Sequence, residues 1–164
     1  MTGTVLQVHS SRGGLPKYPI AEAVVGPAGV QGDHHNHPKF HGGPMKALLL
    51  VCWEAVDALI AQGFPLFAGA LGENVTISGI DHRQMRAGQR YRVGEVVVSL
   101  TTVRVPCKAL DVYGPAIKQA VYDRKVKAGD PSSPLWGMSG FYASVDRRGI
   151  IRPGDPVALI DQAA

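Results

Sequence analysis

One stretch decides the fold class of this chain: residues 88–102, which read GQRYRVGEVVVSLTT. The pattern predicts a β-hairpin with strands over 88–93 and 95–102 and a turn at Gly94. The run Val96-Val97-Val98 is strongly β-prone, because β-branched side chains pack well on a pleated surface. The hairpin therefore makes a β-rich domain the first expectation.

The segments on either side of the hairpin extend this pattern. Short runs bounded by Gly or Pro predict further strands over residues 4–10, 21–25, 45–52, 75–77, 141–146 and 154–160. Apolar residues at helical spacing predict helices over 53–62 and 115–127. Many short strands with few helices favour a mostly β fold, a closed or nearly closed barrel with a few inserted α-helices, because closure removes exposed strand edges.

Length and composition describe one globular domain. The chain has 164 residues, of which 45% are hydrophobic and 18% charged, and its mean hydropathy is +0.02. We expect a single domain over residues 1–164. The first residues lack the pattern of a signal peptide, and the most apolar run, 47–53, is too short to cross a membrane. With two cysteines that are expected to be reduced, the sequence predicts a cytoplasmic protein that does not act on membranes.

The charge balance is informative about partners. A net charge of +4 and a pI near 9.2 favour an anionic small-molecule ligand, because Coulomb attraction raises the local concentration of phosphates and carboxylates. The seventeen basic residues are dispersed, whereas nucleic-acid binding usually needs them clustered on one face. We therefore expect no nucleic-acid partner. The oligomeric state stays open, with a homodimer among the alternatives.

Cys107 is the first candidate for chemistry. It follows a strand and a proline in Arg104-Val105-Pro106-Cys107-Lys108, where nearby cations favour the reactive thiolate. The alternative is a buried structural cysteine, and the residues alone weigh the two equally. Cys52 lies in an apolar run, which favours core packing, and a disulfide between the two would be unusual in the cytoplasm.

A histidine-rich loop is the second candidate. His34, His35, His37 and His41 are close enough in sequence to reach one zinc ion, although the spacing matches no established zinc motif and solvated loop histidines are the alternative. In His41-Gly42-Gly43-Pro44 the glycines let the backbone N–H groups approach an anion, or they form a tight turn. The metal question stays open at this point.

A third polar group, Glu73-Asn74, lies at a loop-to-strand junction. Asn74 has the chemistry to bond the loop backbone or to bind the polar edge of a heterocycle. Glu73 is a candidate proton acceptor, and an exposed carboxylate is the alternative.

Taken in order, these residues resemble the MOSC domain family, which is named after the C-terminal domain of molybdenum cofactor sulfurase. Each motif is weak, but the ordered set covers about residues 33–159 and is specific. The motifs are Gly32-Asp33; His41-Gly42-Gly43-Pro44 with Lys46-Ala47; Gly72-Glu73-Asn74-Val75-Thr76 with Gly79; Arg104 with Pro106-Cys107; and Gly137-Met138-Ser139-Gly140-Phe141-Tyr142 with Gly149 and Gly154-Asp155.

The resemblance implies a stand-alone bacterial-type β-barrel in which Cys107 carries sulfur or contacts molybdenum. It implies a molybdenum cofactor, with pyridoxal phosphate only by association, because the parent sulfurase uses pyridoxal phosphate in a separate domain. Related proteins reduce N-hydroxylated compounds. On this hypothesis Glu73 or His41 transfers protons, and the cofactor is held by a cationic and amide set comprising Lys46, Gly42, Gly43, Asn74 and Arg104.

Two departures from the family pattern affect the substrate more than the cysteine. His35-Asn36-His37-Pro38 replaces a more acidic, arginine-containing pattern, and Gln89 stands where an aspartate often follows Gly88. Two rivals to the enzyme hypothesis stay open. One is a non-catalytic carrier that holds a persulfide on Cys107 for a partner protein, and the other is a zinc protein built on the histidine cluster.

Overall fold

The computed structural model describes residues 1–35 and 42–162. Its strands are β1 (Thr2–Ser10), β2 (Tyr18–Ile20), β3 (Ala23–Gly26), β4 (Gly29–Val30), β5 (Leu48–Cys52), β6 (Val75–Ser78), β7 (Arg90–Val93), β8 (Val96–Val103), β9 (Phe141–Arg147), β10 (Gly149–Ile151) and β11 (Pro156–Asp161). Its helices are α1 (Trp53–Ala61), α2 (Ile117–Val121) and α3 (Arg124–Lys127), with 3-10 turns η1 (Pro44–Lys46), η2 (His82–Gln84) and η3 (Lys108–Tyr113). Within the described residues, no helix has the length and apolar character to cross a membrane.

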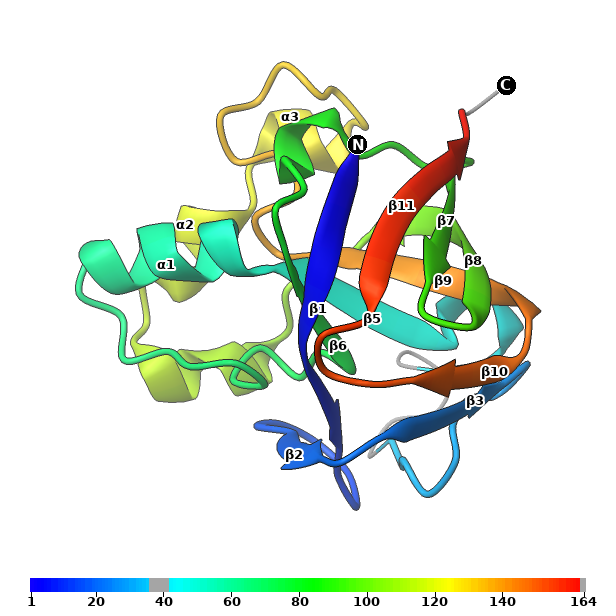
Figure 1. Ribbon diagram of the computed structural model, residues 1–164. Coiled ribbons are helices and arrows are strands. Elements are labelled where there is room, and N and C mark those ends of the chain that lie inside the picture. Colours follow the sequence, from blue (N-terminus) through cyan, green and yellow to red (C-terminus); the bar gives the residue numbers. More distant parts are fainter. Residues whose placement is uncertain (36–41, 163–164) are drawn as a thin grey trace.

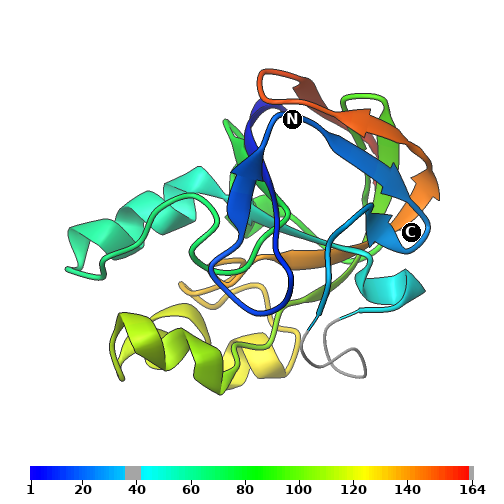
Figure 2. The ribbon, with the colours of Figure 1, turned by 90° about the horizontal axis from the view of Figure 1, so that it is seen from below.

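The main sheet closes on itself to form a barrel (Figures 1 and 2). Its strand order is β11-β7-β8-β9-β5-β6-β1, and β1 pairs with β11 to complete the ring, while β2 extends one end of β1. All these pairs are antiparallel except β5 with β6, which are joined by α1. The predicted mostly β, closed-barrel fold is therefore confirmed.

Strand β5 is buried on both of its faces. Leu48, Leu50 and Cys52 belong to the core inside the barrel. Leu49 and Val51 point the other way and pack in a second core with residues of α1 and α2. This two-sided burial explains the continuous apolar run in the sequence, because a strand with no solvated face has no polar positions. The helices lie beside the barrel, on the side where Figure 1 shows α1 and α2.

The predicted helix over 115–127 is wrong as a single element. The structure divides it into α2 and α3, because Tyr122 adopts an extended conformation and Asp123 then starts a new turn. The Asp123 carboxylate accepts a hydrogen bond of 2.8 Å from the Val126 N–H, the usual N-cap interaction. The predicted strand over 45–52 is also too long, since Pro44–Lys46 forms η1 and the strand starts at Leu48.

The start of β9 depends on a glycine. Gly140 has a φ of +91°, and a Cβ added there would lie 2.6 Å from the Leu50 carbonyl oxygen. Gly154 has nearly the same φ, +90°, but its added Cβ would meet nothing within 4 Å. An alanine at Gly154 would therefore cause backbone strain alone, whereas an alanine at Gly140 would cause both backbone strain and a steric clash.

We predict that Gly154→Ala lowers the free energy of unfolding by roughly 1–3 kcal/mol through backbone strain alone. Gly140→Ala should lower it by a further ~1–3 kcal/mol, because β5 and β9 must also move apart. Urea denaturation measures both values. Equal losses in the two variants would contradict the steric role assigned to Gly140.

Candidate functional site

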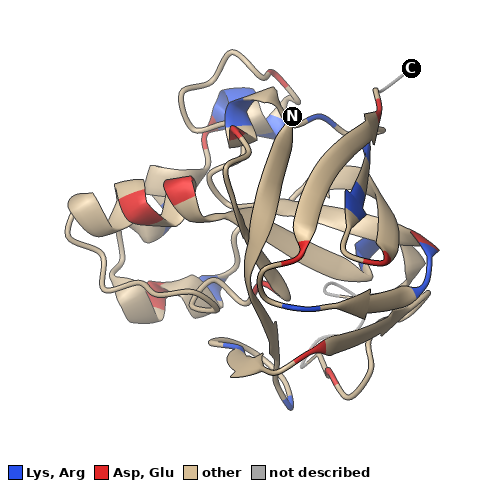
Figure 3. Ribbon diagram, in the orientation of Figure 1, with Lys and Arg blue, Asp and Glu red and all other residues tan. Residues whose placement is uncertain are grey.

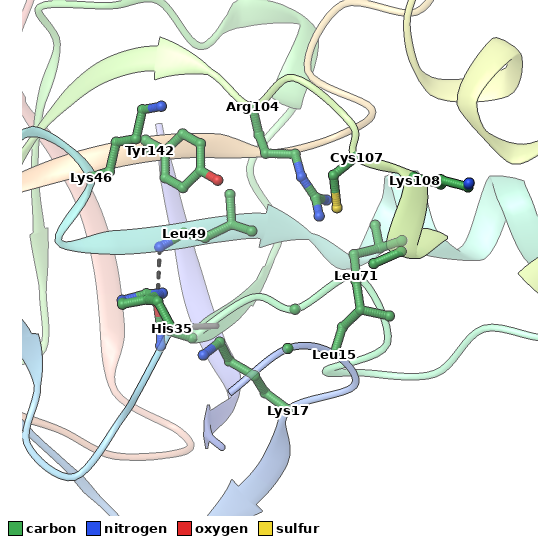
Figure 4. A pocket seen from close by; sticks show the side chains of 14 residues that line it. Leu15, Lys17, His35, Lys46, Leu49, Leu71, Arg104, Cys107, Lys108 and Tyr142 are labelled. Atoms are coloured by element: carbon green, nitrogen blue, oxygen red, sulfur yellow. Dashed lines mark hydrogen bonds between the residues drawn. The ribbon is translucent and has the colours of Figure 1, made fainter. Parts of the chain in front are cut away.

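A cavity of about 260 Å³ lies beside the barrel wall where several loops meet (Figure 4). Its lining combines an apolar wall with several cationic or amide side chains and a thiol. The lining residues are Gly14, Leu15, Lys17, His35, Lys46, Leu49, Leu71, Gly72, Asn74, Arg104, Cys107, Lys108, Ala109 and Tyr142. An apolar cavity with a few convergent polar groups is the usual form of a small-molecule site.

The segment that leaves β8 carries Arg104 and Cys107 into this cavity. Hydrogen bonds fix its start, since the Arg104 N–H donates to the Gly140 carbonyl over 2.9 Å and the Ser139 hydroxyl donates to the Arg104 carbonyl over 2.5 Å. The Cys107 carbonyl accepts from the Leu110 N–H over 3.1 Å as η3 begins. Both ends of the short segment are thus held by backbone hydrogen bonds, which orients the two side chains.

The two cysteines have different environments. Cys107 is partly exposed and lines the cavity, with its sulfur next to the Arg104 side chain in Figure 4. Cys52 is buried in the barrel core, where its Sγ lies 3.6 Å from the Met85 Sδ and burial raises the pKa of its thiol. Only Cys107 therefore combines a thiol with access to a ligand, and Cys52 takes the core position expected for it.

Arg104 is a buried cation with unused donors. The side chain is 3% exposed, and its Nε and Nη1 atoms have no hydrogen-bond partner among the described residues. Leaving such donors unpaired costs free energy, so an acceptor supplied by a ligand would stabilise the site. Arg104 is accordingly the strongest indication that this cavity binds an anion.

Glu73 lies behind the cavity wall and does not line it. Its carboxyl group is fully buried and accepts hydrogen bonds from the Leu71 N–H at 3.2 Å and from the Thr76 hydroxyl at 3.1 Å. Burial raises the pKa of Glu73, while backbone hydrogen bonds, the Thr76 hydrogen bond and the charge of Arg104 act in the opposite direction. Glu73 therefore feels the charge of Arg104 from a buried position, and the exposed carboxylate considered as its alternative is not what the structure shows.

A buried ion pair forms the other side of the cavity. The Lys17 Nζ lies 2.6 Å from the Asp33 Oδ1, and the two side chains are 6% and 3% exposed. Asp33 also accepts from the Ser11 N–H at 2.9 Å and from the Asn74 Nδ2 at 2.8 Å. The Asn74 Oδ1 in turn accepts from the Leu49 N–H at 3.1 Å, the dashed line in Figure 4. The network joins four segments that are distant in sequence.

Lys46 and Tyr142 form the remaining polar part of the lining. The Lys46 Nζ lies 5.1 Å from the centre of the Tyr142 ring, a distance at which a cation is attracted to an aromatic face. Tyr142 is 6% exposed, and burial raises the pKa of its hydroxyl. Figure 4 shows this hydroxyl on the side of the ring that faces Arg104.

The structure brings together four of the residues proposed for the cofactor site, since Lys46, Asn74, Arg104 and Cys107 all line the cavity. Gly42 and Gly43 do not line it. Sequence reasoning missed Lys17 as a site residue, because it lies in a Gly- and Pro-containing segment that matches no motif. It also treated Tyr142 only as part of a family motif.

The proposed histidine cluster is only partly within the described residues. His37 and His41 lie outside them, whereas His35 lines the cavity and burial lowers the pKa of its imidazole. Across residues 1–35 and 42–162, no group of three or more His, Cys, Asp or Glu side chains is arranged to hold a metal ion. The zinc hypothesis therefore stays a prediction.

We predict that Asp33→Asn lowers the free energy of unfolding by roughly 3–5 kcal/mol, because it leaves the Lys17 ammonium buried without its counter-charge. The double variant Lys17→Met with Asp33→Asn should lose clearly less, since both charges disappear together. Urea denaturation of the three proteins provides the measurement. A double variant as unstable as the single one would show that the charge pair is not the source of the loss.

Comparison with known proteins identifies the family. The MOSC domain model matches residues 37–158. The chain is 29% identical over 153 residues to YflK of Bacillus subtilis (strain 168), an uncharacterized protein, and the match covers 91% of this chain and 64% of YflK. It is 33% identical over 92 residues to YiiM of Escherichia coli (strain K12), covering 52% of this chain and 40% of that protein.

The fold agrees with that of a solved YiiM structure. The crystal structure of YiiM from Escherichia coli superimposes with a TM-score of 0.71 at 23% identity, covering 100% of this chain and 72% of that structure. The chain spans less than two thirds of the length of either curated relative, 64% of YflK and 40% of YiiM. With its family model matched over most of its length, and with the barrel and its cavity in place, this chain belongs to the MOSC domain family.

Proposed function

We propose that this protein binds molybdenum cofactor in the cavity and that Cys107 is the ligand to molybdenum. One observation carries the proposal: a partly exposed thiol and a buried arginine with unpaired N–H groups line the same cavity. The first is a soft metal ligand and the second is a donor for oxyanions.

The residues present fit such a group. A thiolate at Cys107 suits molybdenum, and Arg104 has unused donors for phosphate or pterin oxygens. Lys46 and Asn74 line the same space and supply further donors. The side chains of Leu15, Leu49 and Leu71 form the apolar wall, which restricts water around the ligand.

The reaction that we propose is the reduction of N-hydroxylated compounds. The N–O bond breaks, two electrons and two protons are taken up, and an amine and water are released; a reduced redox protein supplies the electrons. When bound, molybdenum cofactor supplies the centre that changes oxidation state. Arg104 and Lys46 would bind and orient the anionic parts of the ligand, and Glu73, which senses the charge of Arg104, is a candidate for proton transfer. His41 is kept as a candidate for proton transfer.

A non-catalytic sulfur carrier is the second candidate function. The partial exposure of Cys107 favours it, because a partner protein could reach this thiol without unfolding the barrel. The Cys107 thiolate would attack the outer sulfur of a donor persulfide, forming a persulfide on Cys107 and releasing the donor thiolate. Such a carrier needs a sulfur-donor protein and turns over nothing by itself.

We predict that the protein, made in a host that synthesises molybdenum cofactor, retains about one molybdenum per chain and that Cys107→Ser loses it, because a hydroxyl is a poor ligand for a soft metal. Mass spectrometry measures the metal content. The matched control is Cys52→Ala, which removes the other thiol and should keep the metal. Both variants are compared with the wild type by thermal unfolding. Retention of molybdenum by Cys107→Ser would refute the ligand assignment.

The sulfur-carrier candidate makes a different prediction for the same proteins. After treatment with a small-molecule persulfide donor and removal of the excess, the intact mass of the wild type and of Cys52→Ala should rise by one sulfur atom, and that of Cys107→Ser should not. The burial of Cys52 protects its thiol from the donor. Equal sulfur uptake by the wild type and Cys107→Ser would exclude Cys107 as the carrier.

A further inference from the structure

We propose that the cavity has two chemically distinct ends: Lys17 and Asn74 bind neutral hydrogen-bond acceptors of the ligand, and Arg104 binds its anionic group. The inference deepens the proposed function, on which it rests, by stating which kind of molecule the cavity selects. That molecule carries an anionic group at one end and carbonyl oxygens or ring nitrogens at the other. Figure 4 shows Lys17 on one side of the leucine side chains and Arg104 with Cys107 on the other.

At the Lys17 end, the protein itself already uses most of the hydrogen-bond donors and acceptors. Of the three protons on the Lys17 ammonium, Asp33 takes one at 2.6 Å and Ser11 takes a second at 3.4 Å. The Asn74 oxygen accepts from the Leu49 N–H, and its amide nitrogen gives one of two protons to Asp33. Among the described residues, each of the two cavity-lining side chains therefore has one N–H without an acceptor, so this end offers donors and selects a ligand with acceptors.

The Lys17 end carries little net charge. Asp33 and Lys17 are both nearly inaccessible to solvent and are in direct contact, so their charges cancel for a ligand in the cavity. A charged ligand group gains little there, whereas a neutral acceptor gains a hydrogen bond without losing as much hydration.

The opposite end carries a net positive charge. Arg104 has two buried nitrogen atoms without a hydrogen-bond partner among the described residues, and Glu73 acts on it through charge without a hydrogen bond in the structure. Lys108 also lines the cavity, although Figure 4 shows its ammonium pointing away from Arg104. An anionic group is therefore stabilised at Arg104, and between the ends Leu49 and Leu71 provide a surface for an apolar or aromatic body.

Two bicyclic probes of similar size separate the roles of the ends. Pterin-6-carboxylate carries a carboxylate and a heterocycle with carbonyl and ring-nitrogen acceptors, while 2-naphthoate carries the carboxylate without those acceptors. Binding to the full chain, purified from a host that cannot make molybdenum cofactor, is measured by calorimetry. The proteins compared are the wild type, Arg104→Gln, the double variant Lys17→Met with Asp33→Asn, and Lys118→Met as a control at an exposed lysine that pairs with Asp111.

The double variant removes one positive and one negative charge, so it leaves the net charge of the cavity unchanged. We expect the double variant to weaken the binding of pterin-6-carboxylate by about tenfold or more. The affinity for 2-naphthoate should change by less than about twofold, because only hydrogen bonds to neutral acceptors of the ligand are lost. Arg104→Gln should weaken the binding of both probes by about tenfold or more, since both carry the anionic group. Lys118→Met should leave both unchanged.

If the double variant loses affinity for both probes to the same extent, or for neither, the two-end assignment is wrong. It is also wrong if the wild type binds neither probe. Thermal unfolding of each variant shows whether it is folded, and retained 2-naphthoate binding shows that its cavity is intact. The molybdenum test on Cys107→Ser is independent of these measurements. Failure of that test with the expected probe pattern would leave a two-ended cavity without the proposed metal.

Discussion

The Asp33 carboxylate is the centre on which the site is built. It collects hydrogen bonds from the Ser11 N–H, the Lys17 ammonium and the Asn74 amide, and so ties the loop after β1, the turn after β4 and the start of β6 to one point. Asn74 passes this constraint to β5, because its backbone N–H and its side-chain oxygen both bond Leu49. Since a buried carboxylate needs its partners, these loops have little freedom to separate.

The barrel could be predicted from the sequence, because its elements have local signals. The hairpin around Gly94 and the helix after Cys52 depend on period and on turn residues that lie within each segment. The short strands β2 and β4 were missed, because strands of three and two residues are too short to show an alternating pattern of apolar and polar residues. The break at Tyr122 was missed as well, because Asp123 competes with a continuous helix only once its capping bond forms.

Some residues of the site could likewise be predicted from the sequence, and others could not. Arg104 and Cys107 were recognisable because they are close in sequence, and the tertiary structure keeps them together. Asp33 belongs to a family motif, but Lys17 lies sixteen residues away in a segment without one, so only the folded barrel reveals them as a pair. The position of Glu73 behind the cavity wall was equally hidden, since sequence patterns do not show on which side of such a wall a side chain lies. Electrostatic roles thus depend on burial, which the sequence reports only indirectly.

The pairing of β1 with β11 has a consequence for how the protein is made. Thr2 pairs with Ala158, so β1, which is synthesised before the other strands of the barrel, waits for β11, which is synthesised after them, before the ring can close. Until then β1 keeps one unsatisfied edge, and such edges invite pairing with other chains. Barrel closure consequently requires that β11 has been synthesised, and during the interval before it the nascent chain is exposed to aggregation.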